Sequence, residues 1–372
     1  ERKVNTKSLL GVISRRAALQ FRFFRIPEAI ANFREVYKLD PDGEKGADAL
    51  INAALLAFRN SNWDLAISLN EEVVRKFATD YKRKTARDDA NQRIVDAYKA
   101  KGNVEDHIKA LYTFIDRYKS DRASSAMVFE AYATIARLHR GRGRTRDEFK
   151  VWNVILTEFE RGNHERDGKP EATAAAEATF RLMEPAYNDY MARKLTVNPR
   201  LKPTKAMAAL QKEVKAMMTT ALGKEVKKKN PTTGQVYYER DGGMFKEYKD
   251  KVATFGSRNW SYAAYLYRAQ MLVHLARTIY AAPTPKNLSE DEEEALAEIL
   301  EKFGGQIENA AMKSLEVALK DAEAKGVVNE WVTKLRVAIN RYKPKDYPLL
   351  KEAKRLTKHP EGTAPGAEKE LR

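Results

Sequence analysis

The chain has 372 residues and contains no cysteine. Disulfides, thiolate zinc sites and thiol nucleophiles are therefore all excluded. Stray thiols mispair in oxidising compartments, so the absence of cysteine from so long a chain favours an envelope or secreted location over the cytoplasm. The first residue is Glu1 rather than methionine, and an upstream signal peptide or lipid anchor is compatible with this sequence.

Long apolar runs are also missing. The most apolar stretch, residues 260–282, carries Arg268, His274 and Arg277. A spanning helix needs about 18 or more consecutive, mostly uncharged apolar residues. We therefore expect no transmembrane span in this sequence.

Recognisable catalytic motifs are absent as well. The five histidines form no HExxH pair, and no Walker loop, GxGxxG or GxSxG occurs. We predict a protein that is not an enzyme and that has no catalytic residue, metal site or cofactor. The enzymatic alternative is a peptidoglycan- or glycan-acting protein, which would need a carboxylate-lined cleft within residues 170–350.

The residues that are abundant favour helices and a basic surface. Ala, Leu, Glu, Lys and Arg dominate, and few segments alternate apolar with polar residues, which predicts an all-α fold. The 68 basic and 52 acidic residues give a net charge of +16. Such a balance suits an acidic partner, although Lys-rich helix faces are often merely solvated.

Four segments of the first half end on an aromatic residue at nearly constant spacing. The segments are REVYKLDP, VVRKFATD, TFIDRYKSD and ILTEFERG, which end near Tyr37, Phe77, Tyr118 and Phe159 at steps of 40, 41 and 41 residues. A period of this length is typical of stacked helical hairpins, because one hairpin cannot bury its apolar face alone. We therefore predict an α-solenoid over residues 1–161.

One hairpin carries a family signature. In EAIANFREVYKLDP, Ala29 and Phe33 lie four residues apart on one helix face, and Pro41 ends the unit. This segment resembles the second helix of a tetratricopeptide repeat, although the period of about 40 exceeds that family's usual length of about 34. The resemblance implies an array of extended tetratricopeptide-like hairpins; a HEAT-like array is the alternative.

An aromatic residue followed by a cation recurs near the ends of successive first helices. The pairs are Phe21-Arg22, Phe58-Arg59 and Tyr98-Lys99. In the tetratricopeptide family the first helices line the concave groove, so this aromatic–cation ladder could bind an acidic or extended protein segment. The alternative is that the rings pack into the next hairpin and the cations are solvated.

The second half of the sequence has a different residue pattern. After the polar segment 162–169, we expect a helical domain over 170–357 and a tail over 358–372. Long helices are predicted at 170–195, 203–228 and 259–281. A further helix starts at Ser289, where acidic residues cap it, and more helices are expected near 305–324, 328–342 and 345–356. A basic loop or hairpin interrupts this domain near 224–243 and carries Lys227, Lys228, Lys229, Tyr237 and Tyr238. These residues could contact phosphates and stack bases, or form a solvated loop.

The closing segment INRYKPKDYPLLKEAKR resembles repeat proteins of the myxobacterial and related bacterial cell envelope. That resemblance implies a periplasmic scaffold. Helical arrays offer long surfaces for binding, so we predict a non-catalytic scaffold or adaptor that binds other proteins, most plausibly in an envelope complex. The alternative is a nucleic-acid-binding helical repeat that uses the basic surface, whose affinity would fall steeply with salt.

Overall fold

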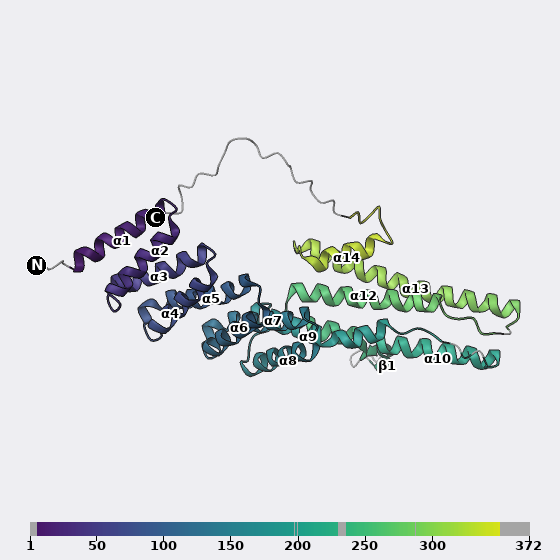
Figure 1. Ribbon diagram of the computed structural model, residues 1–372. Helices are drawn as coiled ribbons and strands as arrows, with labels where there is room; N and C mark the ends of the chain where they lie inside the picture. The colour runs from purple at the N-terminus through teal and green to yellow at the C-terminus, as the bar shows by residue number, and fades with distance from the viewer. Residues whose placement is uncertain (1–5, 197, 199, 230–235, 287, 350–372) are drawn as a thin grey trace, which may run out of the picture. The chain divides into compact units, whose positions relative to one another are not determined.

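A computed structural model describes residues 6–196, 198, 200–229, 236–286 and 288–349 (Figure 1). The chain divides into two compact units. Unit 1 comprises residues 1–186 and 247–261, and unit 2 comprises residues 187–246 and 262–372. The division falls within a helix at Ala186, later in the chain than the polar segment 162–169.

In the described part of unit 1, eight helices form four hairpins in chain order (Figure 1). The pairs are α1 (Thr6–Arg22) with α2 (Ile26–Leu39), α3 (Glu44–Arg59) with α4 (Trp63–Lys76), α5 (Lys84–Lys101) with α6 (Val104–Tyr118), and α7 (Ser125–Gly141) with α8 (Thr145–Arg161). The short turns η1 (Tyr81–Arg83) and η2 (Arg122–Ser124) lead into α5 and α7. Each helix packs against the next one along the chain, so successive hairpins stack. The predicted all-α solenoid is confirmed.

The turns inside the four hairpins share one backbone geometry. Each contains a residue with positive φ: Phe24 at 56°, Ser61 at 57°, Gly102 at 76° and Gly143 at 67°. The N–H of each donates to the carbonyl three residues earlier, in Phe21, Phe58, Lys99 and Arg140 respectively. A residue in the left-handed conformation at the end of a helix lets a backbone N–H donate to carbonyl groups that have no partner within the helix. Because the four hydrogen bonds are equivalent, they identify corresponding positions in the four hairpins without any need for sequence similarity.

Small residues allow the helices of the stack to approach closely. Ala53, Ala54 and Ala57 of α3 are fully buried among larger side chains from α4 such as Leu69 and Val73. The recurring aromatic residues close each hairpin from within: Phe77, Tyr118 and Phe159 are buried, and Tyr37 is half-buried. The apolar period in the sequence thus corresponds to the core.

Unit 1 is completed by segments from beyond the four hairpins. Helix α9 (Pro170–Met191) starts in unit 1 with an alanine-rich buried face. The π-helical turn η3 (Tyr248–Val252) packs against it, and the hydroxyl of Tyr248 donates to the carbonyl of Met183 at 3.1 Å. Helix α12 (Arg258–Tyr280) begins here as well. The segment 162–169 is also packed: the N–H of Gly168 donates to the carbonyl of Phe255 at 2.9 Å.

Unit 2 contains helices and one two-stranded ribbon. Its elements are α10 (Pro203–Leu222), β1 (Lys224–Lys229), β2 (Val236–Asp241), most of α11 (Gly243–Glu247), the rest of α12, α13 (Glu290–Ala324) and α14 (Glu330–Asn340). The expectation that α9 reaches Leu195 and α10 reaches Lys228 is wrong, because they end at Met191 and Leu222. Gly223, with φ of 86°, ends α10 and turns the chain into β1.

The expected helix near 305–324 is part of one longer helix. Helix α13 starts at the predicted capping box, in which the side chains of Ser289 and Glu292 each accept a hydrogen bond from the other residue's backbone N–H. The helix then runs through Gly304 and Gly305 to Ala324. A Cβ atom at Gly304 would lie 2.4 Å from Cε1 of Tyr280. Glycine at this position therefore allows the ring of Tyr280 to pack closely against the helix, and it does not mark a helix end. The expected helix at 345–356 does not form over residues 345–349, and its remainder lies outside the described residues.

Candidate partner-binding groove

The ladder cations are exposed, whereas their aromatic neighbours are half-buried. Phe21 and Phe58 pack against the core of the first two hairpins, and Phe58 meets the ring of Trp63 edge-on at 5.6 Å. Arg22 and Arg59 extend from the same helices into solvent. The two rings therefore contribute to the core, as the packing alternative requires, and only the cations are freely available to a partner.

The third pair of the ladder is displaced by one residue. The turn hydrogen bonds align Phe21 and Phe58 with Lys99 rather than with Tyr98. One residue turns a side chain by about 100° around a helix axis. Tyr98 consequently points elsewhere and lines a separate groove, where burial raises the pKa of its hydroxyl. Binding of a partner by the six ladder residues stays a prediction.

That groove lies between α4 and α6 and has α5 as its floor. Its volume is about 850 Å³. The apolar part of the lining consists of Val74, Ala78, Ile94, Val95, Ala110 and Phe114. The charged part consists of Glu71, Arg75, Arg87, Asp106, Lys109, Arg117 and Asp121. Because α4 and α6 are the second helices of their hairpins, the hollow lies on the second-helix side and not on the first-helix side that the tetratricopeptide resemblance implies.

A buried hydrogen-bond network fixes one end of the groove. The hydroxyl of Tyr118 donates to Oδ1 of Asp88 at 2.8 Å and accepts from Nδ2 of Asn91, whose own Oδ1 accepts from Arg117. Burial, followed by the hydrogen bond to Asp88, raises the pKa of Tyr118 to about 12. Burial alone would raise the pKa of Asp88, but hydrogen bonds from Lys84 and Tyr118 outweigh it and lower the pKa. These polar groups are therefore satisfied and hold α5 and α6 in a defined relation.

The two ends of the groove differ in charge. At one end the guanidinium of Arg87 donates to the carbonyl of Ala78 at 2.6 Å, and Arg75 and Arg117 line the same end together with one carboxylate, Asp121. At the other end Glu71 and Asp106 lie near Tyr98 together with one cation, Lys109. Glu71 and Arg75 on α4 are only one helical turn apart, whereas along α6 the basic end and the acidic end are separated by the length of the apolar floor. From Asp106 to Tyr118 that length is about 18 Å at 1.5 Å per residue.

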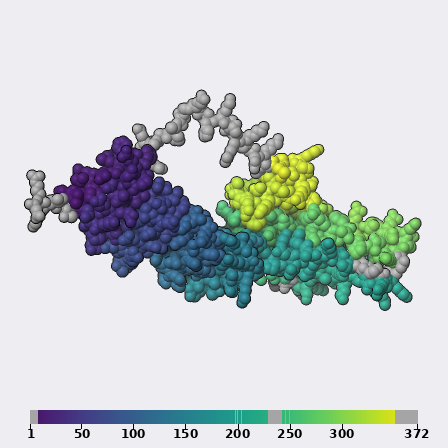
Figure 2. All heavy atoms as spheres, in the orientation of Figure 1, coloured from purple at the N-terminus to yellow at the C-terminus, as the bar shows by residue number. Residues whose placement is uncertain are grey.

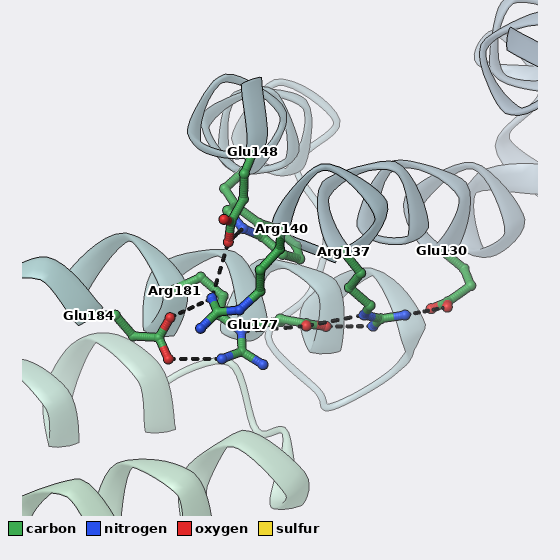
Figure 3. A network of polar contacts seen from close by, with 8 residues as sticks. Glu130, Arg137, Arg140, Glu148, Glu177, Arg181 and Glu184 are labelled. Carbon is green, nitrogen blue, oxygen red and sulfur yellow. Dashed lines mark hydrogen bonds and ion pairs between the residues drawn. The ribbon is translucent and has the colours of Figure 1, made fainter. Parts of the chain in front are cut away.

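A separate concentration of charge ties α7, α8 and α9 together (Figure 3). Three of its carboxylates, Glu148, Glu177 and Glu184, are 4%, 1% and 7% exposed. Each is bound by at least one guanidinium. The pairs are Arg140 Nη1 with Glu148 Oε1 at 3.1 Å, Arg137 Nε with Glu177 Oε1 at 3.1 Å, and Arg181 Nη1 with Glu184 Oε1 at 2.8 Å.

These carboxylates are structural partners rather than candidates for acid–base chemistry. Burial lowers the pKa of Arg137, but its hydrogen bond and ion pair with Glu177 more than reverse this and raise the pKa. Glu148 also accepts from the indole N–H of Trp152 at 3.0 Å. A general acid or base must be able to reach a substrate, and these oxygens are occupied by arginine and tryptophan donors. The network joins helices that are consecutive along the chain.

The basic segment near 224–243 forms an antiparallel ribbon instead of an irregular loop. Lys227 pairs with Tyr238, Lys228 with Tyr237 and Lys229 with Val236 along β1 and β2. The side chains of Lys227 and Lys228 are exposed. The side chains of Lys229, Tyr237 and Tyr238 lie outside the described part of the chain, as do residues 230–235. Contact of this segment with phosphates or bases stays a prediction.

The methionine-rich helix of unit 2 is only partly core. Leu210 and Met217 of α10 are buried. Other members of its apolar stripe border a hollow of about 420 Å³ together with residues of α12 and α13; they are Met207, Val214 and Met218. The apolar stripe of α10 therefore covers a hydrophobic recess as well as a core.

Two further findings concern the described residues alone. Within them, no group of three or more His, Asp or Glu side chains is arranged to hold a metal ion. No helix among these residues combines the length and apolar character needed to cross a bilayer. That the chain is not an enzyme stays a prediction.

Sequence reasoning missed the groove because its lining residues look like ordinary core. Ile94, Phe114 and Tyr118 lie on the inward faces of their helices, and all three are at least half-buried. Periodicity identifies the buried face of a helix but not the angle between neighbouring helices. One signal was available: Asn91 lies on the apolar face of α5, and a buried amide there implies a polar partner such as Tyr118.

Comparisons with known proteins assign no family to the chain. No protein-family model matches the chain, and no curated protein matches it. Among solved structures, the chain is similar to one described as a circular tandem repeat protein with novel repeat topology and enhanced subunit contact surfaces. The identity is 11% over 90% of this chain and 69% of that one, at a TM-score of 0.23. No family is therefore assigned, and the fold class rests on the helices themselves.

Proposed function

We propose that this protein is a non-catalytic scaffold that binds protein partners through its helical-repeat surface, and that the groove between α4 and α6 is a partner site. The observation that carries the proposal is the combination of an apolar floor with a basic and an acidic end in one hollow of about 850 Å³. Apolar contact supplies affinity in such a site, and charges at its ends set the direction of the bound segment.

The groove dimensions suit a short partner segment. A length of about 18 Å accommodates roughly three turns of helix or five to six extended residues. The expected segment has apolar residues at its centre, an acidic end facing Arg75 and Arg117, and a basic end facing Glu71 and Asp106. Docking of an amphipathic segment into a groove of a helical array is a common mode of protein recognition.

We further propose that the hairpins are of tetratricopeptide type and that the complex belongs to a bacterial cell envelope, in the periplasm or at the outer membrane. The Ala29–Phe33–Pro41 pattern supports the first point. The lack of cysteine and the resemblance of INRYKPKDYPLLKEAKR to envelope repeat proteins support the second.

A groove-filling substitution tests the partner site. Thr113 is exposed, lines the groove and donates its hydroxyl to the carbonyl of Lys109 at 3.0 Å. Thr157 on α8 is also exposed and makes the same bond to the carbonyl of Asn153 at 3.0 Å, but it lies outside the groove. Thr113→Trp and Thr157→Trp thus place the same bulky ring on matched helical positions.

The tagged protein and both variants would be purified from native membranes of the source cells, and the co-purifying proteins quantified. We expect Thr113→Trp to lose at least about 90% of its principal partner, which corresponds to a tenfold or greater weakening, while Thr157→Trp retains it. Equal recovery by both variants would overturn the groove as the site. Recovery of nucleic acid in place of protein, lost on raising the salt, would favour the nucleic-acid alternative.

A further inference from the structure

The first helix exposes large apolar side chains on the face opposite its core contacts. Val12 and Leu19 of α1, and Phe23 directly after the helix, follow one another at helical spacing and are 64%, 52% and 74% exposed. The opposite face of α1 carries Leu10, Ile13 and Ala17, which are all buried. A helix that is apolar on two faces is typical of the interior of an array, where both faces are covered.

The same face is strongly and uniformly basic. Helix α1 contains no acidic residue, and Arg15, Arg16, Arg22 and Arg25 are all exposed. Among the residues that the structure describes, none of these four guanidinium groups has an ion pair with a carboxylate. This distinguishes them from arginines deeper in the unit, such as Arg137, which pair with glutamates.

The turn after α1 breaks the pattern of the other hairpins. The left-handed position is occupied by serine or glycine in the later turns, at Ser61, Gly102 and Gly143, but by Phe24 in the first. A bulky residue is disfavoured at positive φ, and Phe24 is 88% exposed, so its ring gains no packing inside the chain. Strain without an internal benefit is a frequent mark of a binding residue.

We propose that the outer face of α1, at the purple end of Figure 2, docks an acidic amphipathic α-helix of a partner protein, as a second surface separate from the α4–α6 groove. A shallow hollow of about 670 Å³ runs along this face between Val12 and Phe23. The partner helix places an apolar stripe over Val12, Leu19 and Phe23. Its carboxylates meet the arginines, so the helix stacks as the next helix of the array would.

Charge argues for this occupant over a second copy of the chain bound through the same face. A symmetric contact between two α1 faces would bring Arg15 and Arg16 of each copy against like charges. An anionic bilayer would also attract the arginines, and the experiment separates it from a helix. The proposal does not depend on the groove, since the two surfaces have no residue in common.

The experiment measures binding of designed 18-residue helical peptides to the full chain by fluorescence anisotropy. One peptide carries leucines at i, i+4, i+7 and i+11 flanked by glutamates, and its mate carries lysines in place of the glutamates. Vesicles with and without an anionic lipid are the third probe. We expect the acidic peptide to bind at least about tenfold more tightly than the basic one, and more weakly at high salt.

Three variants locate the binding. Arg15→Glu/Arg16→Glu should weaken the acidic peptide about tenfold or more. Phe24→Gly should weaken it while raising the Tm by about 2–4 °C, because glycine relieves the strained turn. The matched control is Tyr81→Ser/Lys82→Glu, which removes an exposed ring and an exposed cation from a part of unit 1 outside this face and should change neither value.

Several results would overturn the proposal. These are equal affinity for the acidic and basic peptides, an unchanged affinity in Arg15→Glu/Arg16→Glu, or equal weakening by the control. Binding to anionic vesicles but not to the peptide would assign the face to a lipid surface instead. Self-association that is abolished by Phe24→Gly would assign it to a second copy. None of these outcomes bears on the Thr113→Trp result at the groove.

Discussion

At the scale of single residues, Tyr118 links the core of the array to its surface. Its ring closes the third hairpin, and its hydroxyl satisfies Asp88 and Asn91 at the basic end of the groove. The sequence predicted the buried ring from the aromatic period. It did not predict the polar partners, because Asp88 and Asn91 lie about 30 residues away along the chain, on a different helix.

Removal of this hydroxyl should be costly. Tyr118→Phe removes one hydrogen bond each from half-buried Asp88 and buried Asn91, which keep their other partners, so we expect a loss of about 1–2 kcal/mol in the free energy of unfolding. Urea unfolding of the variant measures the loss. Tyr112→Phe, at an exposed tyrosine of the same helix, is the control and should cost well below 1 kcal/mol. Equal losses would show that the network does not stabilise the fold.

The buried His107 and the half-buried His274 make stability depend on pH. Burial lowers the pKa of His107 and of His274 below the usual value of 6.5. The unfolded chain therefore binds more protons than the folded one as the pH falls through 6.5, and stability decreases. We expect the Tm to fall between pH 7.5 and pH 5.5, and to fall less in His107→Gln/His274→Gln. NMR titration midpoints above 6.5 for either histidine would contradict this account.

At the scale of helices and strands, strong periodicity and capping signals were sufficient to predict the helices that carry them. The four hairpins and the capping box at Ser289 were predicted and confirmed. The segment near 305–324 was expected to be a separate helix but is part of α13, because sequence alone does not reveal the ring of Tyr280 packed against Gly304. The KEVKKK segment was assigned partly to a helix, and its pairing with β2 overrides the local preference of lysine for helices.

The charge network between α7, α8 and α9 should stabilise the end of the array. Glu177→Gln removes a buried negative charge that two arginines share, so we expect a loss of about 3 kcal/mol in the free energy of unfolding. This value is at the low end for a broken buried ion pair, because Arg137 is partly exposed. Glu130→Gln is the control: this residue also pairs with Arg137 but is exposed, and its loss should stay below about 1 kcal/mol. Denaturant unfolding distinguishes the two. A neutral or stabilising Glu177→Gln would show that burial of the charges costs as much as their pairing returns.

At the scale of the whole molecule, the repeat period established the class of fold but not the position of the binding surface. The family resemblance directed attention to the first helices, whereas the α4–α6 groove lies on the second-helix side. A groove between neighbouring hairpins depends on how they pack, and no residue pattern within one hairpin encodes that packing angle. The ladder residues Arg22 and Arg59 still offer exposed charge on the first helices.

Charge reversal tests the ladder without disturbing the fold. Arg22→Glu/Arg59→Glu/Lys99→Glu alters only exposed side chains, so the Tm should change by no more than a few degrees. If the ladder binds an acidic partner, the triple variant should lose that partner while the Thr157→Trp control keeps it. Unchanged affinity of the triple variant for its native partner would exclude the ladder as a binding surface.

The most direct test of the scaffold account is site-specific photo-crosslinking in the source cells. A photoreactive phenylalanine analogue would replace Thr113 in the groove or Thr157 on α8, two exposed threonines in matching helical settings. The account predicts a discrete crosslinked product of one protein from position 113 and none from position 157. Crosslinks from both positions alike, or a partner retained by the chain with no crosslink at position 113, would contradict it.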